Sequence, residues 1–480
     1  MSDSTAPTAQ ETGLAVPPPA APVDPRLAEK EAGKLPPFFS AIFSTRAVSL
    51  AVNVLVVTQL TFYATNSVGL SAGLIGGLFL AAKIVDAASD IFVSYAIDRT
   101  KSRWGKARPY ELLIIPIWLL TVAVFSTPDM STTWQAVYIF VMFLLITSVC
   151  QSFLNKSEGL YLKRAIRGDV RYAKVLSRQG VILVIAAGAA HAGLPLLIGQ
   201  WGDRPGGWTL IATVYAVPMM LLGLVRLFFI KETVTAEEAA AEEQITFRDG
   251  LRSLLRNKYA FVLAGIVLAA NIIITSGGVV GTYFFTYILG DVRLLALITA
   301  AGAVTPFIYL LFPLAVRKIG AINFVRIGLV VATAGYSLVL LFPRDLALVV
   351  AGQVLGSLTT VVTMLVGYFS IQCMAYGEWR TGKRSDAVTT TVIAFAAQVG
   401  QGVASGVIGL VMGAAGFNGL LDTQSAQAEG AIVSLYSVVP LVLTLVMLAL
   451  TFLYSLDTKA AAIRADLSEG IYADTSSLKL

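Results

Sequence analysis

The amino-acid sequence predicts an all-α polytopic membrane protein, with twelve transmembrane helices in two six-helix bundles. Of its 480 residues, 56% are hydrophobic and only 13% are charged, whereas a soluble protein of this length needs far more polar surface. About twelve apolar runs recur along the chain, each close to the roughly 20 residues that cross a bilayer. The runs are expected to begin near Phe38, Ser71, Tyr110, Trp134, Tyr172, Trp208, Lys258, Arg293, Ile322, Leu346, Asp386 and Ala431.

Basic residues alternate between the loops that join these runs. They crowd residues 99–108, 163–174 and 248–258, whereas the loops on the other side carry only Arg204, Arg293 and Arg344. By the positive-inside bias, both termini are expected to be cytoplasmic. The net charge of +6 therefore reflects topology, and no basic module interleaved with aromatic residues predicts binding to nucleic acid.

Polar segments divide the chain into parts. Residues 1–37 are rich in Ala, Pro and Thr, so they are expected to form a disordered cytoplasmic tail. A signal peptide is not expected there, because no early apolar core precedes a cleavage site. The first six-helix bundle is expected at 38–231 and the second at 257–456, with a cytoplasmic linker at 232–256 and a cytoplasmic tail at 457–480. Two such repeats, with a binding site between them at the midplane, are the architecture of a major facilitator transporter.

The second apolar run contains charges that a lipid-facing helix would not tolerate. Lys83, Asp86 and Asp90 are spaced by three, four and seven residues, so they fall on one helical face. Each charge at a bilayer centre costs about 2.5–3.5 kcal/mol on insertion scales. This face is therefore expected to look into a protein interior or a wet cavity, which suggests an ion pathway.

Four motifs resemble those of a known transporter family. DAASD followed by RTKSRWGKARPY (residues 99–110) resembles the second helix and following loop of the glycoside-pentoside-hexuronide:cation symporters, the melibiose carrier family of the major facilitator superfamily. VGLSAGLIGGLFLAAKIVDAASD upstream, GDVRYAKVLSRQG (168–180) and YGEWRTGKR (376–384) lie at that family's places. The resemblance covers residues 36 to 456 and implies twelve helices, alternating access and cation-coupled uptake of a small solute.

The resemblance implies that Asp86 and Asp90 hold the coupling cation. Two carboxylates one turn apart can bind Na+ with neighbouring oxygens, or share a proton. Ser89 and Ser152 occupy positions where the resemblance suggests further cation ligands, although the melibiose carrier has Asn at the first of them. Coupling to H+ and coupling to Na+ both stay open. The alternative is that Lys83 merely neutralises one of the two carboxylates in a buried ion pair.

The positions that bind sugar in this family depart from its pattern. Leu50 and Asn155 stand where the family has acids, Gly159 replaces a nearby Trp, and Gln398 replaces a Lys on the eleventh helix. Sugar hydroxyls favour carboxylates and a flat aromatic face, so a melibiose-like specificity is not expected.

Charged residues near these positions give further candidates. Lys156 and Glu158 are not predicted by the family pattern, and they either recognise a charged or larger solute or lie near the cytoplasmic end. Arg178 matches a family arginine that points into the cavity, while Arg46 either snorkels to the cytoplasmic face, the interpretation we favour, or enters the cavity. The candidate substrate-binding residues are Lys83, Asn155, Glu158, Arg178 and Gln398.

Charged residues of both halves are expected to form a cytoplasmic gate. Ion pairs across the mouth would close it when the transporter faces outward, and pairs worth about 0–1 kcal/mol suit a gate with two states of similar energy. The alternative is that these residues only set topology. They are Asp98, Arg99, Arg103, Lys106 and Arg108 in the first half, and Glu378, Arg380, Lys383 and Arg384 in the second.

The function expected from these features is secondary active symport of a small solute, coupled to H+ or Na+, with alternating access. The solute would be a glycoside, a sugar or a sugar-acid-like compound; a lysolipid or other amphiphile is an alternative, and a non-transporting membrane sensor is another. No HExxH or Walker motif predicts an enzyme.

The remaining expectations concern partners and location. The two cysteines, Cys150 and Cys373, fall in predicted spans, so no disulfide framework or thiolate metal cluster is expected. No cofactor is expected beyond the coupling ion, and no metal beyond a possible Na+ at Asp86 and Asp90. The expected partners are a small-molecule substrate and the lipid bilayer. The protein is expected to be a monomer in the plasma membrane, or in the inner membrane if it comes from a bacterium.

Overall fold

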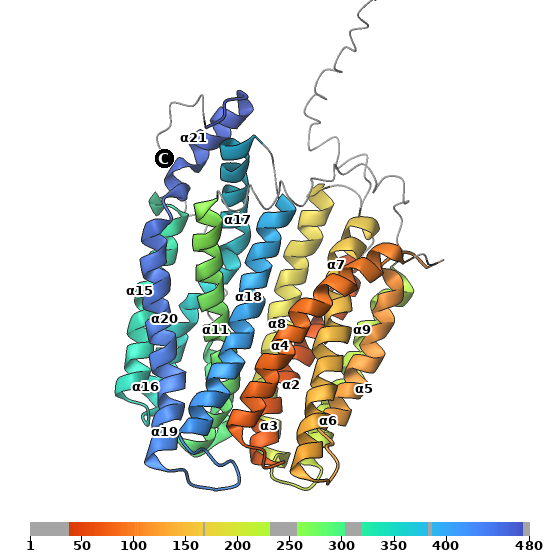
Figure 1. The fold of residues 1–480 in the computed structure, drawn as a ribbon, viewed down its shortest axis with the longest axis vertical. Coiled ribbons are helices and arrows are strands. Elements are labelled where there is room, and N and C mark those ends of the chain that lie inside the picture. Colours follow the sequence, from red (N-terminus) through yellow and green to blue (C-terminus); the bar gives the residue numbers. More distant parts are fainter. Residues whose placement is uncertain are drawn as a thin grey trace, which may run out of the picture.

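The computed structural model describes residues 38–100, 102, 104–166, 169–230, 257–302, 318–382 and 386–473. These residues form helices and no strand, and Figure 1 shows long helices running along a common axis. Within them, nine helical stretches are long and apolar enough to cross a membrane. The predicted tail at 1–37 and the predicted linker at 232–256 lie outside the described residues.

The helices of the first group begin close to the predicted positions. They are α2 Phe39–Thr58 with α3 Leu60–Asn66, α4 Ala72–Arg99, η1 Arg108–Leu113 with α5 Ile114–Val124, α6 Thr132–Leu144 with the π-helix η2 Leu145–Gln151 and α7 Ser152–Ala165, α8 Asp169–Trp201, and α9 Gly207–Phe229.

The second group follows the same pattern. Its elements are α11 Lys258–Tyr287, η3 Val292–Leu294 with α12 Leu295–Gly302, α15 Ala321–Leu341, α16 Leu346–Gly356 with η4 Ser357–Thr359 and α17 Thr360–Thr381, α18 Asp386–Ala414, and α19 Ala426–Val433 with the π-helix η5 Ser434–Val438 and α20 Val439–Leu453. A further helix, α21 Leu456–Ser468, occupies the first part of the predicted C-terminal tail.

Polar side chains define several helix starts. Ser71 accepts a hydrogen bond from the Leu74 amide at the start of α4, and Asn257 accepts one from the Ala260 amide at the start of α11. Such caps satisfy backbone amides that have no partner within the helix. The chain therefore specifies where these helices begin through single residues placed before long apolar runs.

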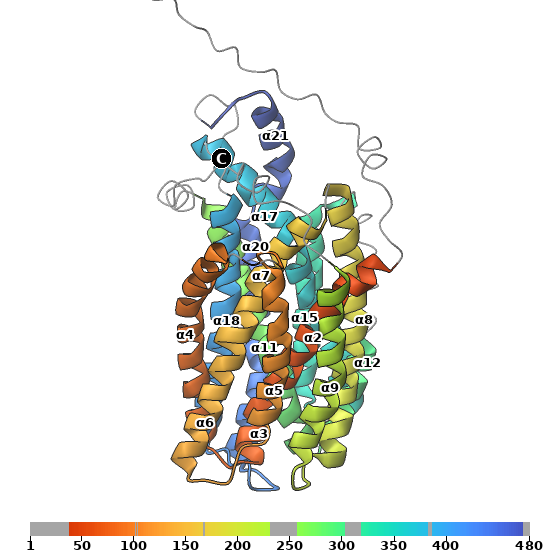
Figure 2. The same ribbon diagram turned by 90° about the vertical axis from the view of Figure 1, so that its right-hand side faces the viewer.

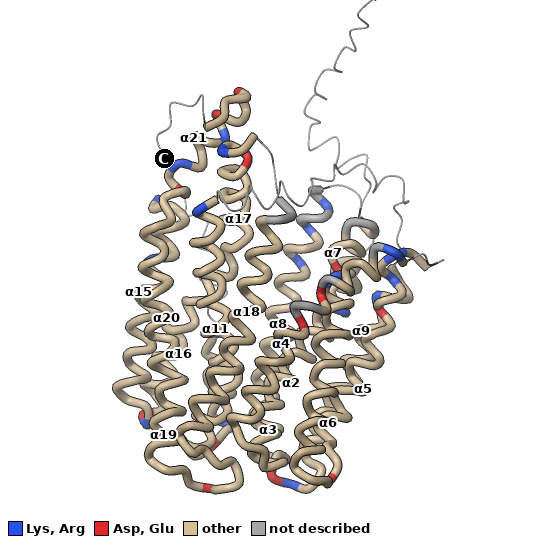
Figure 3. The backbone as a smooth tube through the Cα atoms, in the orientation of Figure 1, with Lys and Arg blue, Asp and Glu red and all other residues tan. Residues whose placement is uncertain are grey.

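The cationic residues concentrate at one end of the bundle. Figure 3 shows Lys and Arg gathered at the end where the C-terminus lies, with few at the other end. We call these the basic end and the opposite end. Helix α4 finishes at the basic end and α11 starts there, in agreement with the alternation of basic loops along the sequence.

The two groups contact each other toward the opposite end. Figures 1 and 2 show α4 beside α18 along their lower halves, where a Cβ on Gly76 would lie only 2.5 Å from the Cα atom of Gly409. The Thr282 hydroxyl donates to the Gln59 side chain at 2.7 Å, and the hydroxyls of Thr65 and Tyr283 are 2.8 Å apart. These contacts hold the groups together on that side.

A buried apolar cluster reinforces this junction. It contains Ile75 of α4 and Ile146 of η2 from the first group, together with Val280 of α11 and Ile408 of α18 from the second. A separate cluster, which includes Leu263 of α11, lies within the second group alone. Buried apolar side chains therefore join the two groups of helices near the opposite end.

Candidate functional site

The predicted acidic face of α4 lies within the bundle. Asp86 is only 8% exposed, and its Oδ2 atom accepts a hydrogen bond from the Lys83 ammonium at 3.2 Å. Its other oxygen, Oδ1, is buried and has no hydrogen-bond partner among the described residues. A buried carboxylate oxygen without a partner is costly, so this atom is available to a ligand that brings positive charge.

Asp90 links three helices from both groups. Its Oδ2 atom lies 3.1 Å from the Lys156 ammonium of α7 and accepts a second hydrogen bond, also of 3.1 Å, from the Gln398 side-chain amide of α18. The side chain of Asp90 is 15% exposed and that of Lys156 is 41% exposed. This carboxylate therefore connects the two groups through one positively charged and one neutral donor.

Neutral oxygens surround the carboxylates. The Ser89 hydroxyl donates to the backbone carbonyls of Asp86 and Ser148, at 2.9 and 3.1 Å, which brings α4 against the π-helix η2. The Ser148 hydroxyl is buried without a partner among the described residues, and the buried Ser152 hydroxyl donates to the Thr147 carbonyl. A π-helical turn often marks a functional site, and clustered oxygens are the ligands that hard cations prefer.

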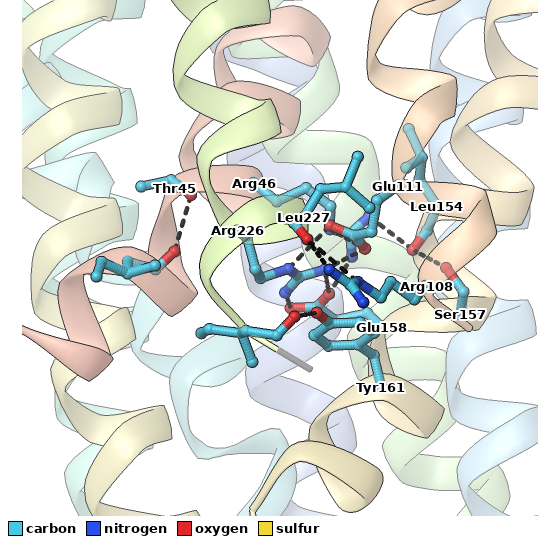
Figure 4. A network of polar contacts seen from close by, with 12 residues as sticks. Thr45, Arg46, Arg108, Glu111, Leu154, Ser157, Glu158, Tyr161, Arg226 and Leu227 are labelled. Carbon is cyan, nitrogen blue, oxygen red and sulfur yellow. Dashed lines mark hydrogen bonds and ion pairs between the residues drawn. The ribbon is translucent and has the colours of Figure 1, made fainter. Parts of the chain in front are cut away.

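A second group of buried charges lies at the junction of α2, η1, α7 and α9 (Figure 4). The Arg226 guanidinium donates to both oxygens of Glu111, at 2.5 and 2.9 Å, and to both oxygens of Glu158, at 2.7 and 3.0 Å. It also lies over the rings of Phe43 and Tyr161. Two carboxylates thus share one arginine that packs against two neighbouring aromatic side chains.

Arg46 completes this network. Its guanidinium donates to Glu158 and, at 2.7 Å, to the Leu154 carbonyl, and the residue is 1% exposed. The prediction that Arg46 snorkels to the cytoplasmic face is therefore wrong, because buried carboxylates attract the guanidinium inward. Glu111 and Arg226 were not predicted from the sequence, although they are opposite charges at the edges of two apolar runs.

The other predicted substrate-binding residues lie around α7 and α8. Asn155 is exposed on α7, next to Lys156, and Arg178 is exposed on α8. The neighbouring Gln179 donates to Glu158 at 3.4 Å. Lys83 and Gln398 meet the carboxylates of α4, whereas Glu158 belongs to the buried network. The structure thus brings two of the five predicted residues to the acidic face.

The sequence matches the MFS/sugar transport protein family over residues 45–458. The chain belongs to this family. The isoprimeverose transporter of Lactiplantibacillus pentosus is 30% identical over 456 residues, which cover 90% of this chain and 91% of that protein. A putative glycoside/cation symporter of Escherichia coli is 26% identical, with 85% of this chain and 89% of that protein covered. The predicted membership among glycoside-pentoside-hexuronide:cation symporters is thereby confirmed.

Solved structures support the fold of this MFS protein. A bacterial homolog of the human lysosomal transporter Spinster, solved in an inward-facing and occupied conformation, superposes with a TM-score of 0.61. It covers 93% of this chain and all of the other, at 13% identity, so the likeness shows the fold alone. The family and its relatives are transporters, and the apolar helices make the chain a multi-pass protein of the bacterial inner membrane.

Those predicted gate residues of this MFS protein that the structure describes lie at the basic end. Arg108 donates twice to the Leu227 carbonyl of α9, at 3.1 and 2.5 Å, and the Arg99 guanidinium lies 4.4 Å from the centre of the Tyr95 ring. Both contacts stay within the first group. Lys106 precedes η1, while Glu378 and Arg380 lie in the last turns of α17. Arg103, Lys383, Arg384 and the side chain of Asp98 lie outside the described residues.

A pocket of about 1000 Å³ opens at the opposite end. Both groups line it, with Asn66, Asp203 and Trp208 from the first and Tyr287 and Asp422 from the second. The Asn66 amide donates to the Tyr287 hydroxyl at 2.5 Å. This hydrogen bond joins α3 to α11 at the pocket.

Proposed function

We propose that this protein is a secondary active symporter, which couples H+ or Na+ to the uptake of a glycoside, sugar or sugar-acid-like solute by alternating access. The observation that carries the proposal is the acidic pair of α4. Asp86 is buried with a free oxygen, and Asp90 is held by residues from both groups. A charge-bearing site at the junction of two helical bundles is what ion-coupled rocking requires.

The cation site of the proposal consists of Asp86 and Asp90 with Ser89 and Ser152. The carboxylates supply charge, and the serine and carbonyl oxygens near η2 can complete the coordination of Na+. Protonation of the same pair would serve H+ coupling, because two close carboxylates share a proton readily. Within the described residues no group of three or more His, Cys, Asp or Glu side chains gathers, so two carboxylates with neutral oxygens form the proposed chemistry.

The solute is proposed to contact Lys83, Asn155, Arg178 and Gln398, with Glu158 in support. The names of the relatives, an isoprimeverose transporter and a glycoside/cation symporter, support a pentoside or related glycoside. Glu158 is already paired with two arginines, so it offers little charge to a solute. The exposed Arg178 would suit hydroxyl groups or an acidic sugar.

The proposed topology has twelve spans and cytoplasmic termini. Nine of these spans are the stretches identified by length and hydropathy. The other three would be α4, the η1–α5 segment and the segment that starts at η3. Six spans would lie in residues 38–231 and six in 257–456, joined by the linker at 232–256. The basic end would then be cytoplasmic. Since the contacts between groups lie toward the opposite end, the conformation would be inward-facing.

Transport assays in proteoliposomes test this function. Purified protein would be reconstituted and given isoprimeverose, methyl glucuronide or melibiose, with an imposed Na+ gradient, an imposed proton gradient or neither. We expect saturable, gradient-driven accumulation of isoprimeverose or methyl glucuronide and none of melibiose. Uptake of a lysolipid in place of both glycosides would contradict the proposed solute class, and facilitated uptake without ion dependence would contradict symport.

A further inference from the structure

The ammonium groups of Lys83 and Lys156, beside the acidic pair, differ in how freely they can move. Lys83 lies on the same helix as Asp86, and its stem packs against α18, where a Cβ on Gly402 would lie 2.8 Å from the Lys83 Cβ. Lys156 reaches Asp90 from a different helix, and 41% of its side chain is exposed. A lysine is a compact charge on a flexible four-carbon stem, so Lys156 can leave its carboxylate by rotation of the side chain alone.

The charges at this site already balance without any bound ion. Lys83 and Lys156 supply two positive charges, and Asp86 and Asp90 supply two negative ones. An added cation would have to share Asp90 with an ammonium that already lies 3.1 Å from its Oδ2 atom, and two positive charges held by one carboxylate repel each other in a bundle interior. Cation binding at Asp90 therefore requires Lys156 to withdraw.

We propose that Lys156 is a tethered stand-in for the coupling cation. Its ammonium compensates Asp90 in the empty transporter, so that the empty form can reorient without an unpaired charge, and the arriving cation displaces it toward the cavity. The inference rests on the proposed symport and adds a residue that determines how the empty transporter returns.

The surroundings of Lys156 favour movement of its side chain over movement of its helix. The Leu154 carbonyl accepts a hydrogen bond from Arg46, and Glu158 is bound by Arg46 and Arg226. The backbone of α7 is thus anchored on both sides of the lysine. Gln398 continues to donate to Asp90 but carries no charge, so it cannot replace the ammonium. The free Oδ1 atom of Asp86 gives the entering cation a ligand that no lysine occupies.

The experiment compares two fluxes through the variant Lys156→Gln in proteoliposomes, with isoprimeverose as the probe, or methyl glucuronide if isoprimeverose is not carried. Exchange of labelled for unlabelled solute needs only the loaded transporter to reorient. Net efflux down a solute gradient also needs the empty transporter to return. We expect exchange to stay within about twofold of wild type, and net efflux to fall about tenfold, because Asp90 is left uncompensated in the empty form.

Matched variants separate charge from packing. Lys156→Arg keeps the charge and should retain net efflux. Lys318→Gln removes an exposed lysine that precedes α15, far from the site in sequence, and should change neither flux. A variant Lys156→Cys can be modified on folded protein, since Cys150 and Cys373 are buried. Aminoethyl methanethiosulfonate, which restores an ammonium, should recover net efflux, whereas the neutral methyl reagent should not.

The outcomes distinguish the two proposals. If wild type carries neither probe, or carries one without ion coupling, the proposed function fails. If wild type is a symporter but Lys156→Gln keeps the wild-type ratio of net efflux to exchange, only the stand-in role is overturned. An equal loss of both fluxes, not repaired by the aminoethyl reagent, also overturns it, because Lys156 would then serve loaded and empty forms alike.

Discussion

Two groups of four charges lie in the first half of this protein, and they are built differently. In the network of Arg46, Glu111, Glu158 and Arg226, every carboxylate oxygen accepts a hydrogen bond, and Arg226 and Glu111 are fully buried. Only the Arg46 Nε atom of this network lacks a hydrogen bond among the described residues, and it lies 3.7 Å from a Glu111 oxygen. At the acidic face of α4, Lys83 and Lys156 each make one contact of 3.1–3.2 Å with an aspartate. One aspartate oxygen there has no partner among the described residues.

This difference separates a structural role from a ligand-exchanging role. A buried ion network is stable only when its donors and acceptors are matched, and removing one member leaves an uncompensated charge. Such a network resists change and holds α2, η1, α7 and α9 together. A cluster with single, partly exposed pairs can exchange a lysine for an ion at small cost. Two positive and two negative charges can therefore support either a fixed scaffold or a transport step, depending on how completely they are paired.

The largest effect is expected from the acidic face. Asp86→Asn and Asp90→Asn should each abolish gradient-driven accumulation of solute, because each removes a charge that holds the coupling cation. Both variants should fold, since a neutral amide is easier to bury than a carboxylate. Uptake in proteoliposomes and thermal unfolding in detergent would be measured together. Concentrative uptake at the wild-type rate in both variants would refute the cation site.

The buried network should respond in the opposite way. Glu111→Gln leaves Arg226 with one carboxylate fewer in a fully buried position, and breaking a buried ion pair costs about 3–5 kcal/mol. We expect a lower thermal midpoint and a lower yield of folded protein, while any folded fraction keeps its dependence on the ion gradient. Glu429→Gln, which removes an acid paired with the exposed Arg344, is the control and should unfold like wild type. Unchanged stability in Glu111→Gln would remove the contrast between the two clusters.

Sequence reasoning recovered much of this molecule, for identifiable reasons. Apolar length predicts the helices, and the spacing of Lys83, Asp86 and Asp90 predicts a shared face, because both follow from local helix geometry. The partners of these residues were harder to predict. The pairs Asp90 with Lys156 and Arg226 with Glu111 join residues 66 and 115 positions apart, and only packing decides which charges meet. Arg46 was misassigned for the same reason, since its partners Glu111 and Glu158 lie on other helices.

A smaller effect is expected where α4 and α18 approach each other, in the contact between the two groups of helices. In Gly409→Ala the added Cβ would lie 2.4 Å from the Gly76 Cα, which is backbone and cannot turn aside. Overpacking of this kind costs about 1–3 kcal/mol, so the opposite end should open more often. A cysteine at Ser126, which lines the pocket there, should react faster from outside. Gly278→Ala, whose Cβ meets nothing within 4 Å, is the matched control; equal reactivity in both variants would contradict the prediction.

The smallest effect is expected at the proposed cytoplasmic gate. If Glu378 pairs with cations such as Arg103 and Arg108 when the inner mouth is closed, then Glu378→Ala removes their acidic partner and favours the inward-open state. An exposed pair is worth about 1 kcal/mol at most, which corresponds to roughly a fivefold change in population. A cysteine at the exposed Asn155 should then be labelled faster from the cytoplasmic side and more slowly from outside.

Glu469→Ala removes an exposed acid that follows α21 and should leave labelling unchanged. If Glu378→Ala leaves it unchanged as well, these charges set only the topology, and the ion pairs that regulate transport are those of α4 alone.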